Sequence, residues 1–308
     1  MDMAAGILAG DMRALARGLT LVEERLPGAR ELCVKLAPHT GRALRVGVTG
    51  APGAGKSTLI DALIRAARAR GERVAVLAVD PSSPRTGGAL LGDRVRMTSH
   101  ANDDGVFVRS MASRGALGAL APNAGEALDL FDAAGFTLLF VESVGAGQAD
   151  VDIAAESDIT LVLSAPGGGD SIQAMKSGIL EIADLWVVSK GDNPQAAALK
   201  HELLAMLALG GADQLEERVC VVAALANQGV EELLAKMLAA GAAARADGAF
   251  AARRRQRVRR RILAVAAELC AEKLPTDTPL LTELEARIRA GDLSVVGAAR
   301  ALLSGGNV

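Results

Sequence analysis

GAPGAGKST, residues 50–58, is the stretch that decides the fold. It fits the pattern G-x4-G-K-[ST], with both glycines, the lysine and the serine in register. It follows a short apolar run, LRVGVT at 44–49, and opens the helical pattern TLIDALIRAAR. Glycines let such a loop wrap closely, so that backbone N–H groups point at phosphate oxygens, and the helix N-terminus adds partial positive charge. The stretch therefore predicts a P-loop between a strand and a helix.

Two side chains of this loop carry most of its predicted chemistry. Lys56 reaches the β- and γ-phosphates in such a loop, and Ser57 supplies a hydroxyl to Mg²⁺. The loop backbone provides the other phosphate contacts. The predicted phosphate-binding residues are Gly50, Gly53, Ala54, Gly55, Lys56, Ser57 and Thr58.

Outward from the P-loop, six more apolar runs of strand length alternate with helical stretches. These runs are RVAVLAV (73–79), VFVR (106–109), TLLFVE (137–142), ITLVLS (159–164), LWVVS (185–189) and RVCVVA (218–223). Such alternation indicates βαβ units and a parallel sheet that is buried on both faces. The predicted fold class is α/β, a P-loop NTPase with a mostly parallel central sheet.

Three segments are predicted along the chain: a helical N-terminal extension over 1–43, a nucleotide-binding G domain over 44–242, and a helical C-terminal arm over 243–308. In the first segment apolar residues recur at the spacing of a helix. These residues are Leu15, Leu19, Val22 and Leu26.

Acidic residues stand at the carboxyl ends of two predicted strands. Asp80 follows the run 73–79, and Glu142 ends the run 137–142. Since the carboxyl ends of parallel strands border the ligand crevice, both are predicted on the metal side of the nucleotide, Glu142 as a Walker-B-like carboxylate. In the SVGAGQ that follows, Gly145 is placed to offer its N–H to the γ-phosphate. Gln148 is a candidate for orienting water, with an ordinary surface glutamine as the alternative.

The strand 185–189 runs into Ser-Lys-Gly-Asp, where GTPases commonly carry N-K-x-D. The carboxylate of Asp192 is predicted to accept from the N1–H and amino group of guanine, a donor pair that adenine lacks. The stem of Lys190 is predicted along the plane of the base, and Ser189 takes the place of the asparagine. On the base side, Ala224 and Leu225 follow the last strand.

Composition narrows the class of protein. The chain has 308 residues, 34 basic and 36 acidic side chains, and 50% apolar residues. This composition excludes an intrinsically disordered chain and a basic nucleic-acid coat protein. Five Phe, one Trp and no Tyr offer little for base stacking. The run RRRQRVRRR at 253–261 is interpreted as a solvated helix that pairs with acids of a dimer mate or of a partner protein. A phosphate-binding patch is the alternative, and no nucleic-acid partner is predicted.

A cytoplasmic protein without a membrane segment is expected. No uncharged apolar run reaches the roughly 18–20 residues of a membrane span, and the first residues lack the basic region of a signal peptide. The three cysteines are scattered, which indicates free thiols. The three histidines lack the paired spacing of metal ligands, so no zinc or nickel site is predicted.

Between about residues 10 and 225, several closely spaced motifs resemble those of the MeaB/ArgK-type P-loop GTPases. AVDPSSPRTGGALLGDRVRM (78–97) is far more specific than a P-loop. The other matching stretches are RALARGLTLVE (13–23), LAPHTGRALRVGVTGAPGAGKST (36–58), FTLLFVESVGAGQ (136–148) and PGGGDSIQAMKSGILEIAD (166–184).

The resemblance implies a SIMIBI-class G domain, a homodimer held by the C-terminal arm, and slow GTP hydrolysis with Mg²⁺. It implies a partner, an adenosylcobalamin-dependent acyl-CoA mutase, whose cofactor loading the G protein gates and protects. Carried over by residue, it places Asp80, Asp93 and Glu142 around Mg²⁺ and the switch loops, and Lys176 in a third switch loop. The implied metal residues are Ser57, Asp80, Asp93 and Glu142. The implied catalytic residues are Lys56, Asp80, Glu142, Gln148 and Lys176.

Two departures from the family pattern bear on the base: Ser189 replaces an asparagine, and Ala223 removes a hydroxyl. Three alternatives stay open for the function: an ATP- or GTP-dependent kinase of the ArgK type, a GTPase that serves another metal centre, and a non-catalytic interaction module. No arginine finger is assigned. Its candidates are Arg85, Arg94 and Arg96.

Overall fold

The computed structural model describes residues 2–80, 100, 102–112, 123–143, 148–167, 182–209, 215–274 and 278–303. The chain divides into two compact units, Met1–Arg253 and Arg254–Val308. The sequence-based division at residues 43 and 242 stays a prediction.

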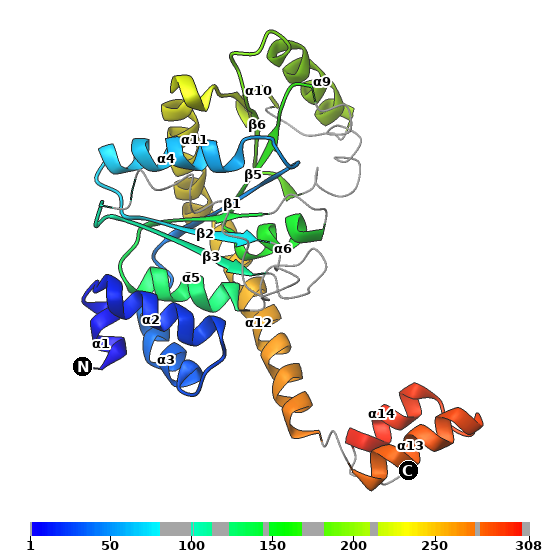
Figure 1. Cartoon of the computed structure of the whole chain (residues 1–308). Coiled ribbons are helices and arrows are strands. Elements are labelled where there is room, and N and C mark those ends of the chain that lie inside the picture. The colour runs from blue at the N-terminus through cyan, green and yellow to red at the C-terminus, as the bar shows by residue number, and fades with distance from the viewer. Residues whose placement is uncertain are drawn as a thin grey trace. The chain divides into compact units, whose positions relative to one another are not determined.

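A seven-stranded sheet forms the centre of the first unit (Figure 1). Its order is β3-β2-β4-β1-β5-β6-β7, and every neighbouring pair is parallel. The strands are β1 (Leu44–Gly50), β2 (Val74–Asp80), β3 (Val106–Ala112), β4 (Leu138–Glu142), β5 (Ile159–Ser164), β6 (Leu185–Val188) and β7 (Val219–Val221). Each apolar run identified in the sequence forms one of these strands, so the predicted α/β fold with a parallel sheet is confirmed.

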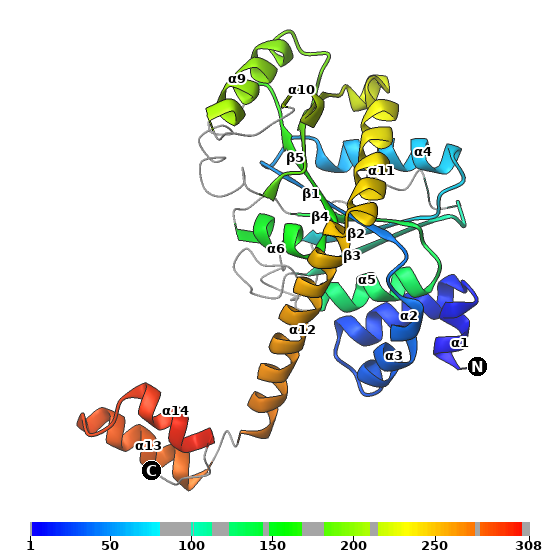
Figure 2. The ribbon, with the colours of Figure 1, turned by 180° about the vertical axis from the view of Figure 1, so that it is seen from behind.

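Helices cover both faces of this sheet (Figures 1 and 2). On one face α4 (Lys56–Ala69) and α11 (Val230–Ala246) pack against residues such as Val46 and Val48. On the other face lie α5 (Ala124–Ala133) and α6 (Gln148–Glu156). The helix α9 (Ala196–Leu209) covers β6 and β7 around the buried Trp186. Because both faces are covered, the central strands are mostly apolar rather than alternating.

One glycine lets a helix approach the central strand. A Cβ on Gly47 of β1 would lie 2.5 Å from Ser157 Oγ and 2.6 Å from Ile153 Cγ2. Only glycine leaves room for α6 and the residues after it at this distance.

The predicted N-terminal helices are α1 (Met3–Leu8), α2 (Met12–Glu23) and α3 (Ala29–Leu36), followed by the short helix η1 (Ala37–His39). Asp11 caps α2 by accepting from the N–H groups of Arg13 and Ala14. The apolar periodicity extends past the end of this helix, because Leu26 lies beyond Glu23 and is 46% exposed.

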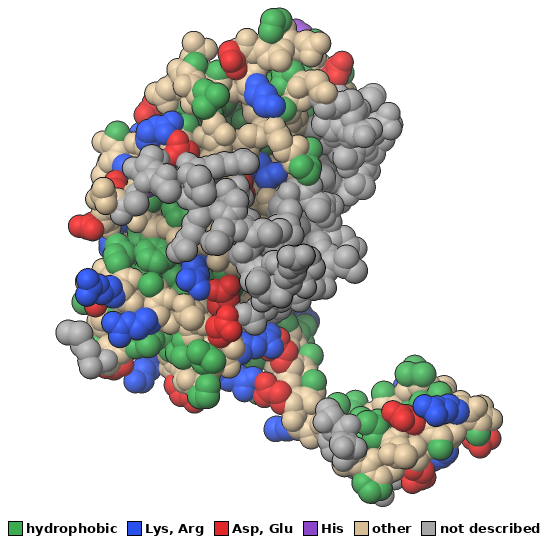
Figure 3. All heavy atoms as spheres, viewed as in Figure 1, with side chains coloured by type: hydrophobic (Ala, Val, Ile, Leu, Met, Phe, Trp, Pro, Cys, Tyr) green, Lys and Arg blue, Asp and Glu red, His purple; other side chains and the backbone are tan. Residues whose placement is uncertain are grey.

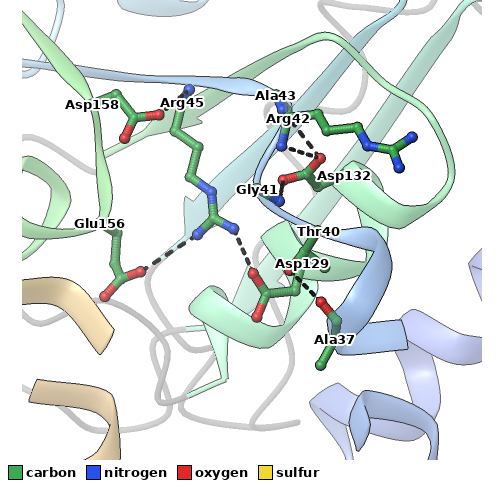
Figure 4. A network of polar contacts seen from close by, with 10 residues as sticks. All are labelled: Ala37, Thr40, Gly41, Arg42, Ala43, Arg45, Asp129, Asp132, Glu156 and Asp158. Carbon is green, nitrogen blue, oxygen red and sulfur yellow. Dashed lines mark hydrogen bonds and ion pairs between the residues drawn. The ribbon is translucent and has the colours of Figure 1, made fainter. Parts of the chain in front are cut away.

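A buried carboxylate joins this N-terminal segment to α5 (Figure 4). Asp132 is 3% exposed, and its oxygens accept from the backbone N–H groups of Gly41, Arg42 and Ala43 at 2.6, 3.2 and 3.1 Å. Successive N–H groups that converge in this way form an anion-binding concavity. Asp132 occupies it and thereby holds the chain at its entry into β1.

A buried guanidinium lies beside this contact. The side chain of Arg45 in β1 is 4% exposed, and it pairs with Asp129 of α5 at 2.5 Å and with Glu156 of α6 at 3.8 Å (Figure 4). Arg45 N donates to Asp158 Oδ2 at 3.0 Å. One residue of the central strand thus connects both helices of this face.

The described part of the first unit also contains α10 (Leu215–Arg218) and η3 (Ala224–Ala226). The arginine-rich run lies in α12 (Ala249–Lys273), as the sequence predicts. Its first member, Arg253, pairs within the chain: its guanidinium donates to both carboxylate oxygens of Asp184, at 2.6 and 3.0 Å. On the face that Figure 3 shows, basic and acidic side chains of this unit are interspersed.

In the second unit, α13 (Pro279–Ala290) and α14 (Val295–Leu303) pack through Leu284, Ala298 and Ala301. Across the described residues, no helix combines the length and the apolar character that a membrane crossing needs.

We expect Asp132→Ala to lower the free energy of unfolding by about 3 kcal/mol, because it leaves several backbone donors without their acceptor. Asp132→Asn, which keeps one acceptor oxygen, falls between this variant and the wild type. Denaturant unfolding measures the difference, with the exposed Asp104→Ala as the control. A loss for Asp132→Ala no larger than that of the control would contradict the role given to Asp132.

Candidate nucleotide-binding site

Those predicted site residues that the structure describes lie at the carboxyl edge of the sheet. The strand β1 lies between β4 and β5, with β2 and β3 on the side of β4 and with β6 and β7 on the side of β5. The chain thus builds one half of the sheet, returns next to β1 and then builds the other half. Ligands of open parallel sheets bind in the crevice at such a switch point. The P-loop starts here, at the end of β1.

Three glycines of the P-loop have positive φ angles. These are +140° at Gly50, +76° at Gly53 and +90° at Gly55, a backbone conformation that L side chains rarely adopt. Space is a further constraint at Gly50, where a Cβ would lie 2.3 Å from the carbonyl oxygen of Leu163 in β5. At Gly53 and Gly55 a Cβ would meet no atom within 4 Å, so both face open space.

Lys56 is folded onto the loop that precedes it. Its Nζ donates to the carbonyl oxygens of Gly50 at 2.9 Å and Ala51 at 3.2 Å, and the residue is only 7% exposed. The ammonium group therefore lies within the curve of the P-loop. This is where a phosphate cradled by the loop amides needs a positive charge.

Ser57 and Glu142 come together from the first turn of α4 and the end of β4. The Ser57 hydroxyl donates to Glu142 Oε1 at 2.6 Å, and the two residues are 6% and 3% exposed. A hydroxyl and a carboxylate are hard oxygen donors of the kind that Mg²⁺ prefers. Across the described residues, no three His, Cys, Asp or Glu side chains are grouped to hold a metal ion. The pair nevertheless fits Mg²⁺ in a nucleotide site, since phosphates and water supply most ligands there.

Sequence reasoning missed a second pair at the same strand ends. The hydroxyls of Thr49 and Ser143 lie 2.9 Å apart and are buried. Thr49 directly precedes the P-loop, and Ser143 directly follows Glu142. The available signal was the presence of small hydroxyl residues at the ends of otherwise apolar strands.

Ser189 connects the base side to the phosphate side. Its hydroxyl lies 2.6 Å from the carbonyl oxygen of Ala54 in the P-loop and 3.1 Å from that of Ser164 at the end of β5. The residue is 6% exposed. The serine in the position of the asparagine thus bonds to the P-loop backbone.

The other predicted base-side residues are accessible. Lys190, with a φ of +51°, and Asp192 are both exposed. Between them Gly191 N donates to Val222 O at 3.0 Å, which holds this loop against the end of β7. Across the loop, the side chain of Leu225 is 91% exposed.

The same base-side loop is closed by Ala223, which exchanges two backbone hydrogen bonds with Gln228 at 3.0 and 3.1 Å. Ala224 begins η3, directly before Leu225, and packs against the core. Ala223 is 3% exposed. A buried methyl group thus lies where the family pattern has a hydroxyl.

Other predicted site residues are described in part or not at all. Asp80 ends β2, paired in register with Ala112, and Gln148 begins α6, but their side chains lie outside the described part of the structure. The predictions for Gly145, Asp93 and Lys176, and for the arginine-finger candidates Arg85, Arg94 and Arg96, fall on residues outside the described ranges.

Comparison with known proteins gives the family. The family described as "Methylmalonyl Co-A mutase-associated GTPase MeaB" matches residues 15–278. The chain belongs to the MeaB family. It is therefore a GTP-hydrolysing P-loop protein, and its family membership implies binding of a guanine nucleotide.

Relatives in this family come from distant organisms. A protein of Pyrococcus abyssi is 45% identical over 270 residues, which is 86% of this chain and 83% of that protein. The GTPase ArgK of Escherichia coli is 40% identical over 233 residues, 73% of this chain and 70% of ArgK. The mouse protein "Methylmalonic aciduria type A homolog, mitochondrial" is 34% identical over 247 residues, 74% of this chain and 60% of that protein.

A solved structure shares the fold along nearly the whole chain. The crystal structure of a LAO/AO transport system kinase superposes with a TM-score of 0.72 and 27% identity, covering 99% of this chain and 96% of that one. The resemblance seen in the sequence motifs is thereby confirmed by the overall architecture.

We expect Ser189→Ala to lower the free energy of unfolding by about 1–2 kcal/mol, because it removes a buried hydroxyl that bonds to two other segments. GDP binding weakens as well, since Ala54 and Lys190 lose their common tether. Thermal unfolding and titration with a fluorescent GDP analogue measure these effects. Ser189→Thr, which keeps the hydroxyl, is the control. Equal behaviour of the alanine and threonine variants would contradict the tether.

Proposed function

We propose that this MeaB-family protein hydrolyses GTP with Mg²⁺ in order to gate adenosylcobalamin delivery to an acyl-CoA mutase and to protect the loaded mutase. The buried contact between Ser57 and Glu142 beside Lys56 carries the hydrolytic part of the proposal, because it groups a metal-side hydroxyl, a carboxylate and a phosphate-side cation. The family description, which names an association with methylmalonyl-CoA mutase, supports the choice of partner.

The hydrolysis is an in-line attack of water on the γ-phosphorus, in which the bond to the β-phosphate oxygen breaks and GDP and phosphate leave. Lys56 exchanges its carbonyl partners for the β- and γ-phosphate oxygens and neutralises charge on the transferred group. The P-loop amides form a cradle that needs no rearrangement. Ser57 and Glu142 would hold Mg²⁺, which would supply further neutralisation of the phosphate charge.

Roles for the other predicted residues follow from the family resemblance. We propose Asp80 and Asp93 on the metal side, Gly145 and Gln148 at the γ-phosphate, and Lys176 as a partner-responsive lysine. Positioning and electrostatics dominate this type of chemistry, so it needs no strong general base. Slow basal turnover follows when no arginine finger reaches the phosphate.

The base is held from the other side of the P-loop. We propose that Lys190 and Asp192 bind guanine beside Ala224 and Leu225, with Ser189 as the tether that positions them. The exposure of Lys190, Asp192 and Leu225 leaves these side chains open to a base.

We propose a cytoplasmic homodimer that forms through the C-terminal arm. Within the second unit, α12 exposes large apolar side chains at Val258, Ile262 and Leu263, by 53, 62 and 63%. Light scattering of the purified protein tests this assembly, and a monomer at micromolar concentration would contradict it.

Lys56→Ala is expected to reduce GTP turnover by at least 100-fold, because the charge on the transferred phosphoryl group loses its nearest cation, an effect on the order of 3 kcal/mol. Release of phosphate under saturating GTP measures it. Lys35→Ala, at a surface lysine of α3, is the control for loss of a positive charge. Unchanged turnover in Lys56→Ala would overturn the hydrolytic proposal.

The partner is tested by measuring GTP and ATP hydrolysis with and without a panel of adenosylcobalamin-dependent acyl-CoA mutases. We expect guanine-selective turnover that rises severalfold with one mutase. Equal hydrolysis of ATP and GTP would mean that Ser189 has altered the selectivity of the base site. A turnover that no mutase changes would contradict the chaperone role and leave the GTPase activity in place.

A kinase is the second candidate, because the solved structure that shares the fold is named a transport system kinase. The two activities differ in where the γ-phosphate goes. Radiolabelled γ-phosphate transferred to a protein acceptor would favour the kinase, whereas label recovered only as inorganic phosphate favours the GTPase.

A further inference from the structure

Two polar contacts, Ser57–Glu142 and Thr49–Ser143, lie near the ends of β1 and β4 on opposite faces of the sheet. Val46 and Val48 of β1, and Leu138 and Phe140 of β4, contribute to the core on the α4 side. Side chains alternate along a strand. Glu142 therefore points to the α4 side, where it meets Ser57.

The hydroxyl pair lies on the opposite face. Leu139 and Val141 of β4 contribute to the core on the α5 and α6 side. By the same alternation Thr49 and Ser143 point to this side, where their hydroxyls lie 2.9 Å apart. The backbone supports the contact, since Ser143 N donates to Val48 O at 3.1 Å and extends the pairing of Val48 with Glu142 by one residue.

We propose that the Thr49–Ser143 pair positions Glu142 for the metal. This inference rests on the proposed GTPase chemistry. A serine hydroxyl that binds an ion through a lone pair keeps its proton, so Ser57 would still donate to Glu142 across the 2.6 Å contact. That contact holds the end of β4 on the α4 side only, and the Thr49–Ser143 pair holds it on the opposite face.

The Thr49–Ser143 pair links the residue before the P-loop to the residue after Glu142 without using a proposed metal ligand. It is one residue away from Glu142 on one strand and one residue away from Gly50 on the other. It is buried, so water does not compete for its hydrogen bond, and breaking it leaves a buried hydroxyl without this partner. Thr49 and Ser143 are thus assigned as positioning residues, which act on the metal through Glu142.

The test compares Thr49→Val and Ser143→Ala with the wild type. The first variant keeps the shape of the side chain, and the second removes one oxygen. We expect each to raise the Mg²⁺ concentration for half-maximal GTP hydrolysis by roughly 5- to 10-fold, the effect of losing one buried hydrogen bond. The same shift is expected in a measurement that needs no turnover, the slowing by Mg²⁺ of fluorescent GDP release.

The double variant shows whether the two hydroxyls act through each other or independently. If the hydroxyls act through each other, Thr49→Val/Ser143→Ala shifts the Mg²⁺ dependence no further than either single variant. GDP affinity in EDTA stays at the wild-type value, which a general loosening of the site would not allow. Thr49→Ser and Ser143→Thr, which keep the hydroxyls, retain the wild-type Mg²⁺ dependence.

Ser157→Ala is the matched control, because it removes another buried hydroxyl on the same face of the sheet, one that donates to Ile153 O at 2.6 Å. Additive shifts, or shifts equal to that of Ser157→Ala, would overturn the positioning role alone. A wild-type protein whose GDP release and GTP turnover both ignore Mg²⁺ would overturn the proposed function and this inference together.

Discussion

The site depends on the close contact between the start of the P-loop and the neighbouring strand. At Gly50 the backbone has a φ of +140°, and a Cβ would lie 2.3 Å from Leu163 O. Any side chain there would push the loop away from β5 or force β5 to move, and either change is felt in a densely packed interior. The position of the loop in turn places Lys56 and Ser57 at the start of α4 and lets Ser189 reach Ala54 O. One glycine therefore sets the geometry of both the phosphate side and the base side.

Around this contact, the polarity of the strands changes abruptly at their carboxyl ends. The interiors of β1, β4, β5 and β6 are mostly apolar, but small hydroxyl residues and a carboxylate follow where each strand ends. Buried polar groups are tolerated when they are hydrogen-bonded, and here they bond to neighbouring segments: Ser57 of α4 to Glu142, Thr49 to Ser143, and Ser189 to Ser164 O. A buried polar layer thus lies directly under the proposed nucleotide position, where its groups can exchange partners without entering the apolar core.

Local signals account for what could be predicted from the sequence. Apolar runs with Val and Leu located all seven strands, and the P-loop pattern placed Lys56 and Ser57 at a helix start, because both features arise between residues that are close in the chain. The contacts that were missed join distant residues: 94 positions separate Thr49 from Ser143, and 135 separate Ser189 from Ala54. Spacing carries no information about such pairs until the strand order is known. Spacing also misplaced Leu26: it continues the helical periodicity, but the helix α2 has already ended at Glu23.

The partners of Lys56 show why the described arrangement is ready for an anion. Its ammonium group is almost fully buried and would be unfavourable there without acceptors; the carbonyl oxygens of Gly50 and Ala51 provide them. These acceptors are neutral carbonyl groups, whereas a phosphate oxygen carries negative charge and also attracts the ammonium group by Coulomb interaction. A phosphate oxygen in the loop is therefore the better partner for the same ammonium group. The carbonyls hold Lys56 in place before the nucleotide binds without competing effectively against it, so the loop keeps its shape while its charge becomes available.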